Sequence, residues 1–264
     1  MTLSIPGTLL CNDQDRVRVL TFDRPEKKNA FTRAMWGAMA TALNDAATNS
    51  NVACVVVTGS GNAFTSGLDL SEFDENPLNE RSDVNTFEAF ISALEAFPKP
   101  VLAAVNGVAV GVGVTMLAHC DLVLAAHSAR FRAPFVPLGM TAEAASSVLL
   151  PERIGYQTTA HFLFTGAWMD AEAALRSGLV WRVESDDALY ESTLTLAREI
   201  ATMPMSSLIA TKELLLAGRL DRVRAARVRE TERYGQLFGA AANLEAFAAF
   251  RERRDPDFRS IPGE

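Results

Sequence analysis

Two apolar runs of strand length, each followed directly by a glycine-rich turn, constrain this chain more than any other feature. The first run, Val52–Thr58, leads into Gly59–Gly67, and the second, Val101–Val105, leads into Asn106–Gly113. A continuous apolar run of this length is typical of a strand that is covered on both faces, as in a sheet between helices. The repeated pattern therefore predicts an α/β fold with buried strands and places glycine turns at two strand ends.

Strand and helix signals alternate up to about residue 190. The composition of Val17–Phe22 predicts a further strand, and the four-residue spacing of Met35, Met39 and Leu43 predicts one face of a helix. Beyond this point the strand signals stop and helices are expected. The expected helices are Leu194–Met203, Ser206–Ala217, Leu220–Phe238 and Ala240–Arg253. We therefore divide the chain into a core, residues 1–195, and a helical C-terminal segment, residues 196–264.

Two segments of the core have patterns that bear on a site. The acidic stretch Ser71–Val84 contains Pro77 and is expected to be a loop or a mobile lid. Thr141 is expected to be the N-cap of a helix over Ala142–Leu150, with Pro151 ending it.

The composition excludes several classes of protein. The 264 residues include 25 Lys and Arg and 32 Asp and Glu, so the net charge of −7 argues against a nucleic-acid partner. Cys11, Cys54 and Cys120 are widely spaced, which favours buried thiols in a reducing compartment over disulfides or a zinc site. Val101–Ala118 is interrupted by glycines, and the N-terminus lacks a signal-peptide pattern. We therefore expect no membrane span and a cytoplasmic location.

Common catalytic motifs do not fit the two glycine turns. Gly111-Val-Gly113 lacks the third glycine of a dinucleotide-binding turn, and neither turn has the Gly-Lys-Ser/Thr of a phosphate-binding loop. Ser60 and Ser66 both lack the first glycine of Gly-x-Ser-x-Gly. Strand-to-helix turns leave backbone N–H groups without helical partners, and two such donors together would form an oxyanion hole. The alternative is that the glycines only permit tight connections.

Several motifs in order resemble those of the crotonase (enoyl-CoA hydratase/isomerase) superfamily. Phe64-Thr-Ser-Gly-Leu-Asp-Leu70 resembles its Phe-Ser-Ala-Gly-Leu-Asp-Leu signature, and Arg24-Pro-Glu-Lys-Lys-Asn-Ala30 resembles its Arg-Pro-x-x-x-Asn-Ala segment. Lys99–Gly111 resembles a second characteristic motif of the superfamily and is followed, as in that family, by Cys120-Asp121. The resemblance extends over about residues 21–254. It implies a crotonase fold, which is a spiral of ββα units, and C-terminal helices that form a homotrimer or a dimer of trimers.

The resemblance also implies the residues of an acyl-CoA site. Two peptide N–H groups form the oxyanion hole in this superfamily, and by motif position they fall on Ser66 and Val112. The glutamates with which hydratases add water fall on Thr115 and Phe135, and neither residue is a carboxylate base. The other residues carried over to the substrate site are Gly67, Leu68, Asp69, Leu70, Gly111, Leu138 and Gly139.

Phe131–Ser147 instead resembles the peroxisomal-type Δ3,Δ2-enoyl-CoA isomerases, whose single catalytic base is a glutamate. The resemblance puts this base on Glu143, with Ala142 in place of the group's proline and Ala144 in place of its glycine. One carboxylate can move a proton from C2 to C4 while the N–H donors stabilise the dienolate. The apolar neighbours are expected to raise the pKa of Glu143. The alternative is an acidic residue that is simply favoured in the first turn of a helix.

A CoA thioester is anionic, as is this chain, so local basic groups are required to bind it. Arg24, Lys27 and Lys28 are candidates, as is the basic run Phe250–Pro256, although a single charge of this kind is more often a solvated surface charge than a ligand contact. The resemblance implies a Δ3,Δ2-enoyl-CoA isomerase of fatty-acid β-oxidation that needs no metal or redox cofactor. The alternatives are hydration or another reaction of CoA esters, and a non-catalytic acyl-CoA-binding subunit.

Overall fold

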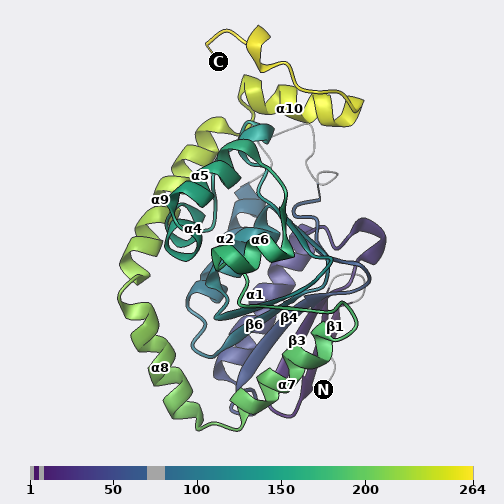
Figure 1. Cartoon of the computed structure of the whole chain (residues 1–264). Helices are drawn as coiled ribbons and strands as arrows, with labels where there is room; N and C mark the ends of the chain where they lie inside the picture. The colour runs from purple at the N-terminus through teal and green to yellow at the C-terminus, as the bar shows by residue number, and fades with distance from the viewer. Residues whose placement is uncertain (1–2, 6–8, 70–80, 264) are drawn as a thin grey trace.

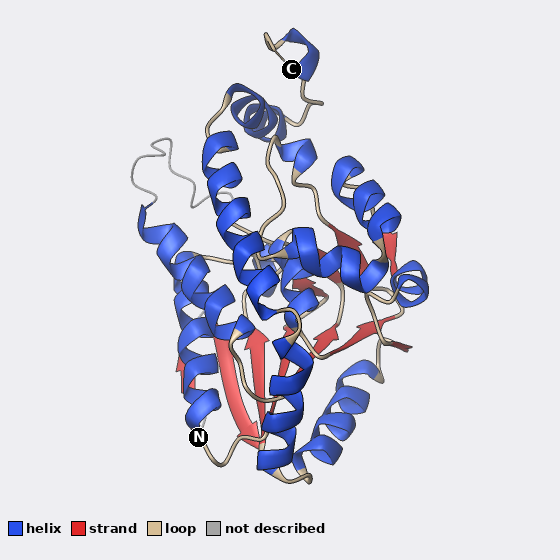
Figure 2. Ribbon diagram, turned by 90° about the vertical axis from the view of Figure 1, so that its left-hand side faces the viewer, coloured by secondary structure: helices blue, strands red, loops and turns tan. Residues whose placement is uncertain are grey.

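A computed structural model describes residues 3–5, 9–69 and 81–263, and its strands form two sheets surrounded by helices (Figures 1 and 2). The strands are β1 (Leu3–Ile5), β2 (Leu9–Gln14), β3 (Val17–Phe22), β4 (Cys54–Gly59), β5 (Ala63–Thr65), β6 (Val101–Val105), β7 (Val108–Val110), β8 (Leu122–Ala126), β9 (Arg130–Arg132), β10 (Met169–Asp170) and β11 (Arg182–Glu184). In the described residues, one sheet has the order β1-β2-β3-β4-β6-β8-β11 and the other has the order β10-β9-β7-β5.

Helices follow most of these strands. They are α1 (Arg33–Thr48), α2 (Arg81–Glu95), α3 (Val112–Thr115), α4 (Ser146–Ile154), α5 (Tyr156–Thr165), α6 (Ala171–Ser177), α7 (Leu189–Ala201), α8 (Met205–Ala217), α9 (Leu220–Leu237) and α10 (Ala241–Glu252). Short 3-10 helices lie at η1 (Pro25–Lys27), η4 (Met116–His119), η5 (Val136–Leu138) and η6 (Phe258–Ser260). Among the described helices, none is both long enough and apolar enough to cross a membrane.

Three strands of the large sheet are each followed, next in the sequence, by a strand of the small sheet. β4, β6 and β8 are parallel neighbours in the large sheet, and the strands that follow them, β5, β7 and β9, are parallel neighbours in the small sheet. A helix comes after β5 and after β7, so the predicted ββα units are present. The ends of β5 and β7 consequently lie side by side, which brings the two glycine turns together.

The apolar runs become the buried centre of the large sheet, as predicted. All five residues of β6 are buried, and β4 is buried from Cys54 to Thr58. α7 packs against β4 and β6, and the parallel neighbours on each side complete the hydrogen bonding of both strands. Burial on both faces explains why these strands carry no alternation of polar and apolar residues.

The C-terminal helices pack along the core. The helices expected after residue 190 are present, although α7 begins at Leu189 rather than Leu194. α9 lies beside α4, and α10 lies over η5, with α8 and α9 forming one long edge of the molecule in Figure 1. Their position brings residues near 230 and 250 close to core segments that are a hundred residues earlier in the chain.

The expected helix over Ala142–Leu150 is wrong at both ends. α4 begins at Ser146 because Ala144 and Ala145 both have left-handed backbone angles, with φ values of 56° and 59°. Pro151 lies inside α4. Because proline has no N–H, the carbonyl of Ser147 lacks its helical hydrogen bond, and Ser147 is exposed. Glu143 therefore lies in a loop before the helix. Of the expected lid, residues 71–80 lie outside the described part, and α2 begins at Arg81.

Candidate active site

A cavity of about 1040 Å³ lies between the core and the C-terminal helices. Its core wall includes residues from both glycine turns, together with Phe135, Leu138 and Glu143. Its other wall includes Arg227, Glu230 and Tyr234 of α9 and Phe247 and Phe250 of α10. The C-terminal segment therefore forms part of the same cavity as the predicted site.

The two glycine turns, residues 66–68 and 110–112, are called the oxyanion turns below. Gly67 has a φ of +87°, and a Cβ there would lie 2.8 Å from the carbonyl oxygen of Val110. Gly111 also has a positive φ, at +57°. Glycine permits both the backbone angle and the close approach of the turns, because it has no Cβ.

Ser66, the first predicted oxyanion donor, is a wrong assignment. Its N–H donates to the carbonyl of Lys28 at 2.9 Å and is already satisfied. The backbone groups on either side of Leu68 pair with Phe31. The Phe31 N–H donates to the Gly67 carbonyl at 2.7 Å, and the Phe31 carbonyl accepts from the Asp69 N–H at 2.9 Å. Leu68 lies between these bonds, so its own N–H points the opposite way. No partner is recorded for that N–H among the described residues, and Leu68 lines the cavity.

The second donor position agrees with the predicted residue. Val112 is the first residue of α3, so its N–H has no partner within the helix. The preceding Gly111 N–H donates to the Arg132 carbonyl at 2.9 Å, whereas no partner of the Val112 N–H is recorded in the described part of the chain. Val112 also lines the cavity. The N–H groups of Leu68 and Val112 are thus the two donors that the oxyanion turns leave available.

Glu143 lies on the same cavity wall and is partly buried. Burial, followed by the negative charges of Glu230 and Glu88, raises the pKa of its carboxyl from 4.5 to about 8. In the described residues, no hydrogen bond or ion pair of its carboxylate is recorded. Such a carboxyl exchanges a proton near neutral pH, which is what proton transfer requires of a general acid or base.

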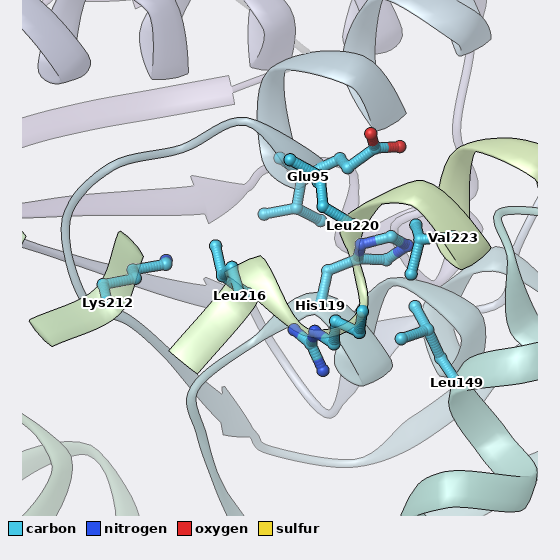
Figure 3. A pocket seen from close by; sticks show the side chains of 9 residues that line it. Glu95, His119, Leu149, Lys212, Leu216, Leu220 and Val223 are labelled. Carbon is cyan, nitrogen blue, oxygen red and sulfur yellow. The ribbon is translucent and has the colours of Figure 1, made fainter. Parts of the chain in front are cut away.

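The base loop, residues 140–145, carries Glu143 and is held by side chains from distant parts of the sequence. His119 lies at the end of η4, and its Nε2 donates to the Ala144 carbonyl at 2.7 Å. Burial lowers the pKa of His119 to about 4, so its ring is neutral, and Nε2 carries the hydrogen because a carbonyl only accepts. Its ring borders a cavity of only about 10 Å³, beside Leu149 and Val223 (Figure 3).

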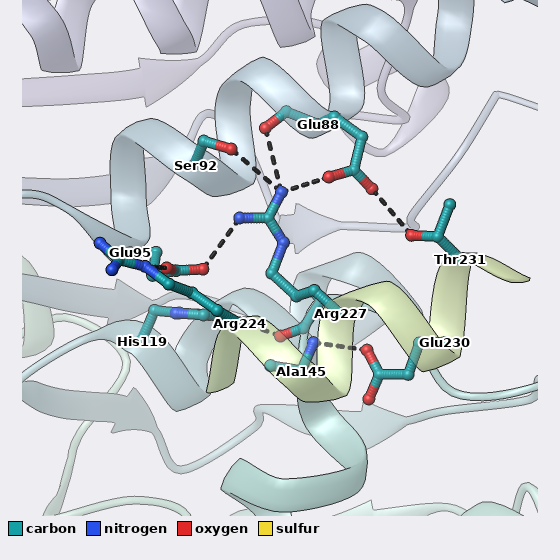
Figure 4. Close-up of polar contacts among 10 residues, drawn as sticks. Glu88, Ser92, Glu95, His119, Ala145, Arg224, Arg227, Glu230 and Thr231 are labelled. Carbon is teal, nitrogen blue, oxygen red and sulfur yellow. Dashed lines mark hydrogen bonds and ion pairs between the residues drawn. The ribbon is translucent and has the colours of Figure 1, made fainter. Parts of the chain in front are cut away.

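Glu230 holds the end of the base loop from α9. The Ala145 N–H donates to its Oε2 at 2.6 Å, and the Ser147 N–H donates to its Oε1 at 2.8 Å (Figure 4 draws the Ala145 contact). Neither His119 nor Glu230 lies in a motif that marks it in the sequence. One signal was present, because Glu230 continues the buried stripe of Val223 and Ala226 on α9.

An ionic cluster attaches α9 to α2 beside the cavity. Arg227 pairs with Glu88, and its Nη1 also donates to Glu95 at 2.8 Å. The Thr231 hydroxyl contacts the second oxygen of Glu88 at 3.3 Å (Figure 4). The cluster therefore fixes the stretch of α9 on which Glu230 lies.

The structure brings most of the predicted site residues together. Those that line the cavity are Lys27, Ser66, Gly67, Leu68, Asp69, Gly111, Val112, Leu138 and Glu143. Leu70 lies outside the described residues. Lys28 and Gly139 are not on the cavity wall, and a Cβ on Gly139 would lie 2.6 Å from the N atom of Asn243.

Arg24 is also absent from the cavity wall, because its guanidinium is used elsewhere. It pairs with Asp69 at 3.0 Å and donates to the Ala30 carbonyl at 2.7 Å. Arg24 therefore braces the first oxyanion turn, and its predicted contact with CoA is a wrong assignment.

Comparisons with known proteins agree with this fold. The sequence profile of the enoyl-CoA hydratase/isomerase family matches residues 12–261. The chain is 32% identical to 2,3-dehydroadipyl-CoA hydratase of Escherichia coli over 95% of this chain and 98% of the relative. It is 34% identical to enoyl-CoA delta isomerase 2 of Rattus norvegicus over 82% of this chain and 56% of the relative. A crystal structure of an enoyl-CoA hydratase/isomerase from Pseudoalteromonas atlantica superposes with a TM-score of 0.91, at 39% identity over 95% and 99% of the two chains.

The fold and the site thus define a crotonase-fold enzyme, and the chain belongs to the enoyl-CoA hydratase/isomerase family. Its relatives include a hydratase as well as an isomerase. Family membership therefore establishes the class of enzyme, and the residues of the site must distinguish between the two reactions.

Proposed function

We propose that this enzyme is a Δ3,Δ2-enoyl-CoA isomerase that uses Glu143 as its only acid/base group and requires no metal or redox cofactor. The observation that carries the proposal is the position of Glu143 on the cavity wall that also holds Leu68 and Val112. The residues at the positions of the hydratase glutamates, Thr115 and Phe135, cannot act as carboxylate bases.

The reaction uses these groups in two proton transfers. The thioester carbonyl of a 3-enoyl-CoA accepts hydrogen bonds from the N–H groups of Leu68 and Val112. Glu143 takes the C2 proton, and the electrons of the C–H bond delocalise over the diene and the thioester oxygen. The protonated Glu143 then returns the proton at C4, which gives the 2-enoyl-CoA and regenerates the carboxylate. The N–H donors stabilise negative charge that develops only in the transition state and the dienolate.

The raised pKa of Glu143 matches this proposed role. The ionised carboxylate removes the C2 proton, so kcat/KM should rise with pH through a midpoint near the pKa of about 8. A base with this pKa binds a proton more strongly than an exposed glutamate does, and the same group then protonates C4.

The remaining parts of the proposal concern the substrate and the assembly. Lys27 and Arg254 border the cavity and are the candidates for contact with the CoA phosphates. The resemblance further supports cytoplasmic fatty-acid β-oxidation as the setting and a trimer or a dimer of trimers as the assembly, formed through the C-terminal helices.

The test is to follow the products of a 3-enoyl-CoA and of a 2-enoyl-CoA with the wild-type enzyme and with Glu143→Gln. We expect the wild type to convert the 3-enoyl to the 2-enoyl thioester, and the variant to bind the thioester with no turnover. The exposed Glu232→Gln is the control and should retain activity. Formation of a 3-hydroxyacyl-CoA as the main product would indicate a hydratase instead. Binding without turnover by the wild type would indicate a non-catalytic subunit.

A further inference from the structure

We propose that Glu230 is a positioning residue for Glu143: its carboxylate holds the strained end of the base loop through two backbone hydrogen bonds and adds negative charge beside the base. This inference rests on the proposed role of Glu143, and it assigns a function in the site to α9, a helix of the C-terminal segment.

The base loop needs external support because two consecutive alanines have left-handed backbone angles. Ala144 and Ala145 have φ values of 56° and 59°. An L-residue with a Cβ is disfavoured in this region, and it remains there only when surrounding contacts determine its conformation. Both alanines are buried, so these contacts come from within the protein.

The contacts of Glu230 replace a missing helix cap. Ala145 is the N-cap residue of α4 and offers no side chain to the free N–H groups of the first turn. Both oxygens of the Glu230 carboxylate instead accept backbone hydrogen bonds, from Ala145 at 2.6 Å and from Ser147 at 2.8 Å. A negative charge at a helix N-terminus is favourable, so this arrangement stabilises both the helix start and the loop conformation.

The peptide groups that follow Glu143 are consequently fixed one after another. The Glu143 carbonyl accepts from the Ser146 N–H at 2.9 Å, and the Ala144 carbonyl accepts from His119 at 2.7 Å. Glu230 fixes this same Ala144–Ala145 peptide from its other side, through the Ala145 N–H. In the described residues, no hydrogen bond of the Glu143 side chain is recorded, in contrast to these peptide groups.

Glu230 is itself held in place. It is buried, with 7% of its surface exposed. Arg227, one helical turn earlier on α9, is bound to Glu88 and Glu95 of α2. The stretch of α9 that carries Glu230 is therefore tied to a second element.

The charge of Glu230 adds a second effect. The charged groups of neighbouring elements that act on Glu143 are Glu230 of α9 and Glu88 of α2. Arg227 of α9 lines the same cavity and is paired with Glu88, and neutral His119 of η4 contacts the carbonyl of the next residue, Ala144. The negative charge of Glu230 raises the pKa of Glu143. Removal of that charge should lower this pKa, whereas a loss of packing alone would not require a shift in this direction.

The first experiment compares kcat, KM and the pH profile of Glu230→Gln, Glu230→Asp and Glu232→Gln. Glu230→Gln keeps one acceptor and removes the charge, so we expect kcat to fall by about ten- to a hundredfold, with KM little changed, and the midpoint to move to lower pH. Glu230→Asp keeps the charge but is one methylene shorter, so kcat should fall while the midpoint stays. Glu232 is exposed on the same helix, and Glu232→Gln should match the wild type.

The second experiment does not depend on the reaction. The carboxyl carbon of Glu143 is titrated by ¹³C NMR in the wild type and in Glu230→Gln, and its signal is assigned by its absence in Glu143→Gln. A lower pKa in Glu230→Gln supports the inference even if the wild type proves not to be an isomerase. An isomerase whose kcat and Glu143 titration are unchanged in Glu230→Gln overturns the inference and leaves the proposed function intact. If Glu230→Gln does not fold, Glu230→Asp decides by its kcat: unchanged kcat overturns the inference.

Discussion

The oxyanion turns and the base loop face the same cavity, but different means hold their backbones in unusual conformations. The oxyanion turns have glycines at their positive φ positions, Gly67 and Gly111. The base loop has alanines there, Ala144 and Ala145. The glycines adopt these angles without strain, whereas the alanines depend on His119 and Glu230.

The difference follows from which atoms do the chemistry. At the oxyanion turns the backbone N–H groups themselves contact the substrate in the proposed reaction, and adjacent strands of one sheet fix them. At the base loop a side chain does the chemistry, so its backbone requires hydrogen bonds from outside the loop. In the oxyanion turns the glycines themselves permit the backbone angles, whereas the angles of the base loop depend on residues 119 and 230.

Among the changes that test how the two regions are held, the largest expected effect comes from deleting one N–H at the oxyanion turns. Val112→Pro removes the donor but suits the first position of α3, where proline is tolerated because that N–H has no helical partner. We expect kcat to fall by about a hundred- to a thousandfold, with the fold retained. Val112→Ala, which keeps the N–H, is the matched control. Steady-state kinetics with a 3-enoyl-CoA would contradict this role of the turn if the two variants had similar kcat.

Low pH should destabilise the protein, because it favours protonation of His119, which supports the base loop. Burial lowers its pKa from 6.5 in the unfolded chain to about 4 in the fold. The unfolded state therefore binds more protons between these values, and this contribution to stability is lost as the pH falls from about 6.5 to 4, by about 3 kcal/mol. His119→Gln keeps an N–H donor without titrating. Urea unfolding at pH 7 and near pH 4 should show a smaller acid effect in this variant, and equal effects would rule out His119 as the cause.

Stability measurements can test whether the oxyanion turns truly need glycine. Gly67→Ala would place a Cβ 2.8 Å from the Val110 carbonyl at a φ of +87°, so we expect a loss of about 2 kcal/mol or more in the free energy of unfolding. Gly37 of α1 has open space around its Cβ position, and Gly37→Ala should instead stabilise the protein by up to about 1 kcal/mol. Thermal unfolding that gives both changes the same sign would contradict the argument.

The smallest expected effect concerns Lys27 and Lys28, which lie in the segment that supports the first oxyanion turn. It distinguishes a role of the side chain from a role of the backbone carbonyl. Lys27 lines the cavity, whereas Lys28 contributes its carbonyl to the Ser66 N–H. Lys27→Ala should raise KM for CoA thioesters by about two- to fivefold with kcat unchanged, because an exposed charge contributes little. Lys28→Ala keeps the carbonyl and should leave KM unchanged. Equal changes in both variants would mean that neither side chain has a specific contact.

The same comparison explains what the sequence could predict. The buried strands, the glycine turns, Val112 and Glu143 all lie in segments whose local pattern or motif identifies them. The motif position predicts Ser66, but which N–H group is free depends on backbone pairing with Lys28 and Phe31, across a gap of more than thirty residues. The start of α4 depends on the backbone angles of two alanines, and alanine is ordinarily a helix-forming residue.

The dependence of the base loop on α9 also has a consequence for the order in which the enzyme matures. Chains fold from the N-terminus as they are synthesised. The sheets, the oxyanion turns and Glu143 are all complete in the chain before residue 230 has been added. Until α9 docks, the alanines before α4 lack the carboxylate that holds them. A nascent chain that has already assembled its sheets should therefore have little catalytic activity until α9 is in place.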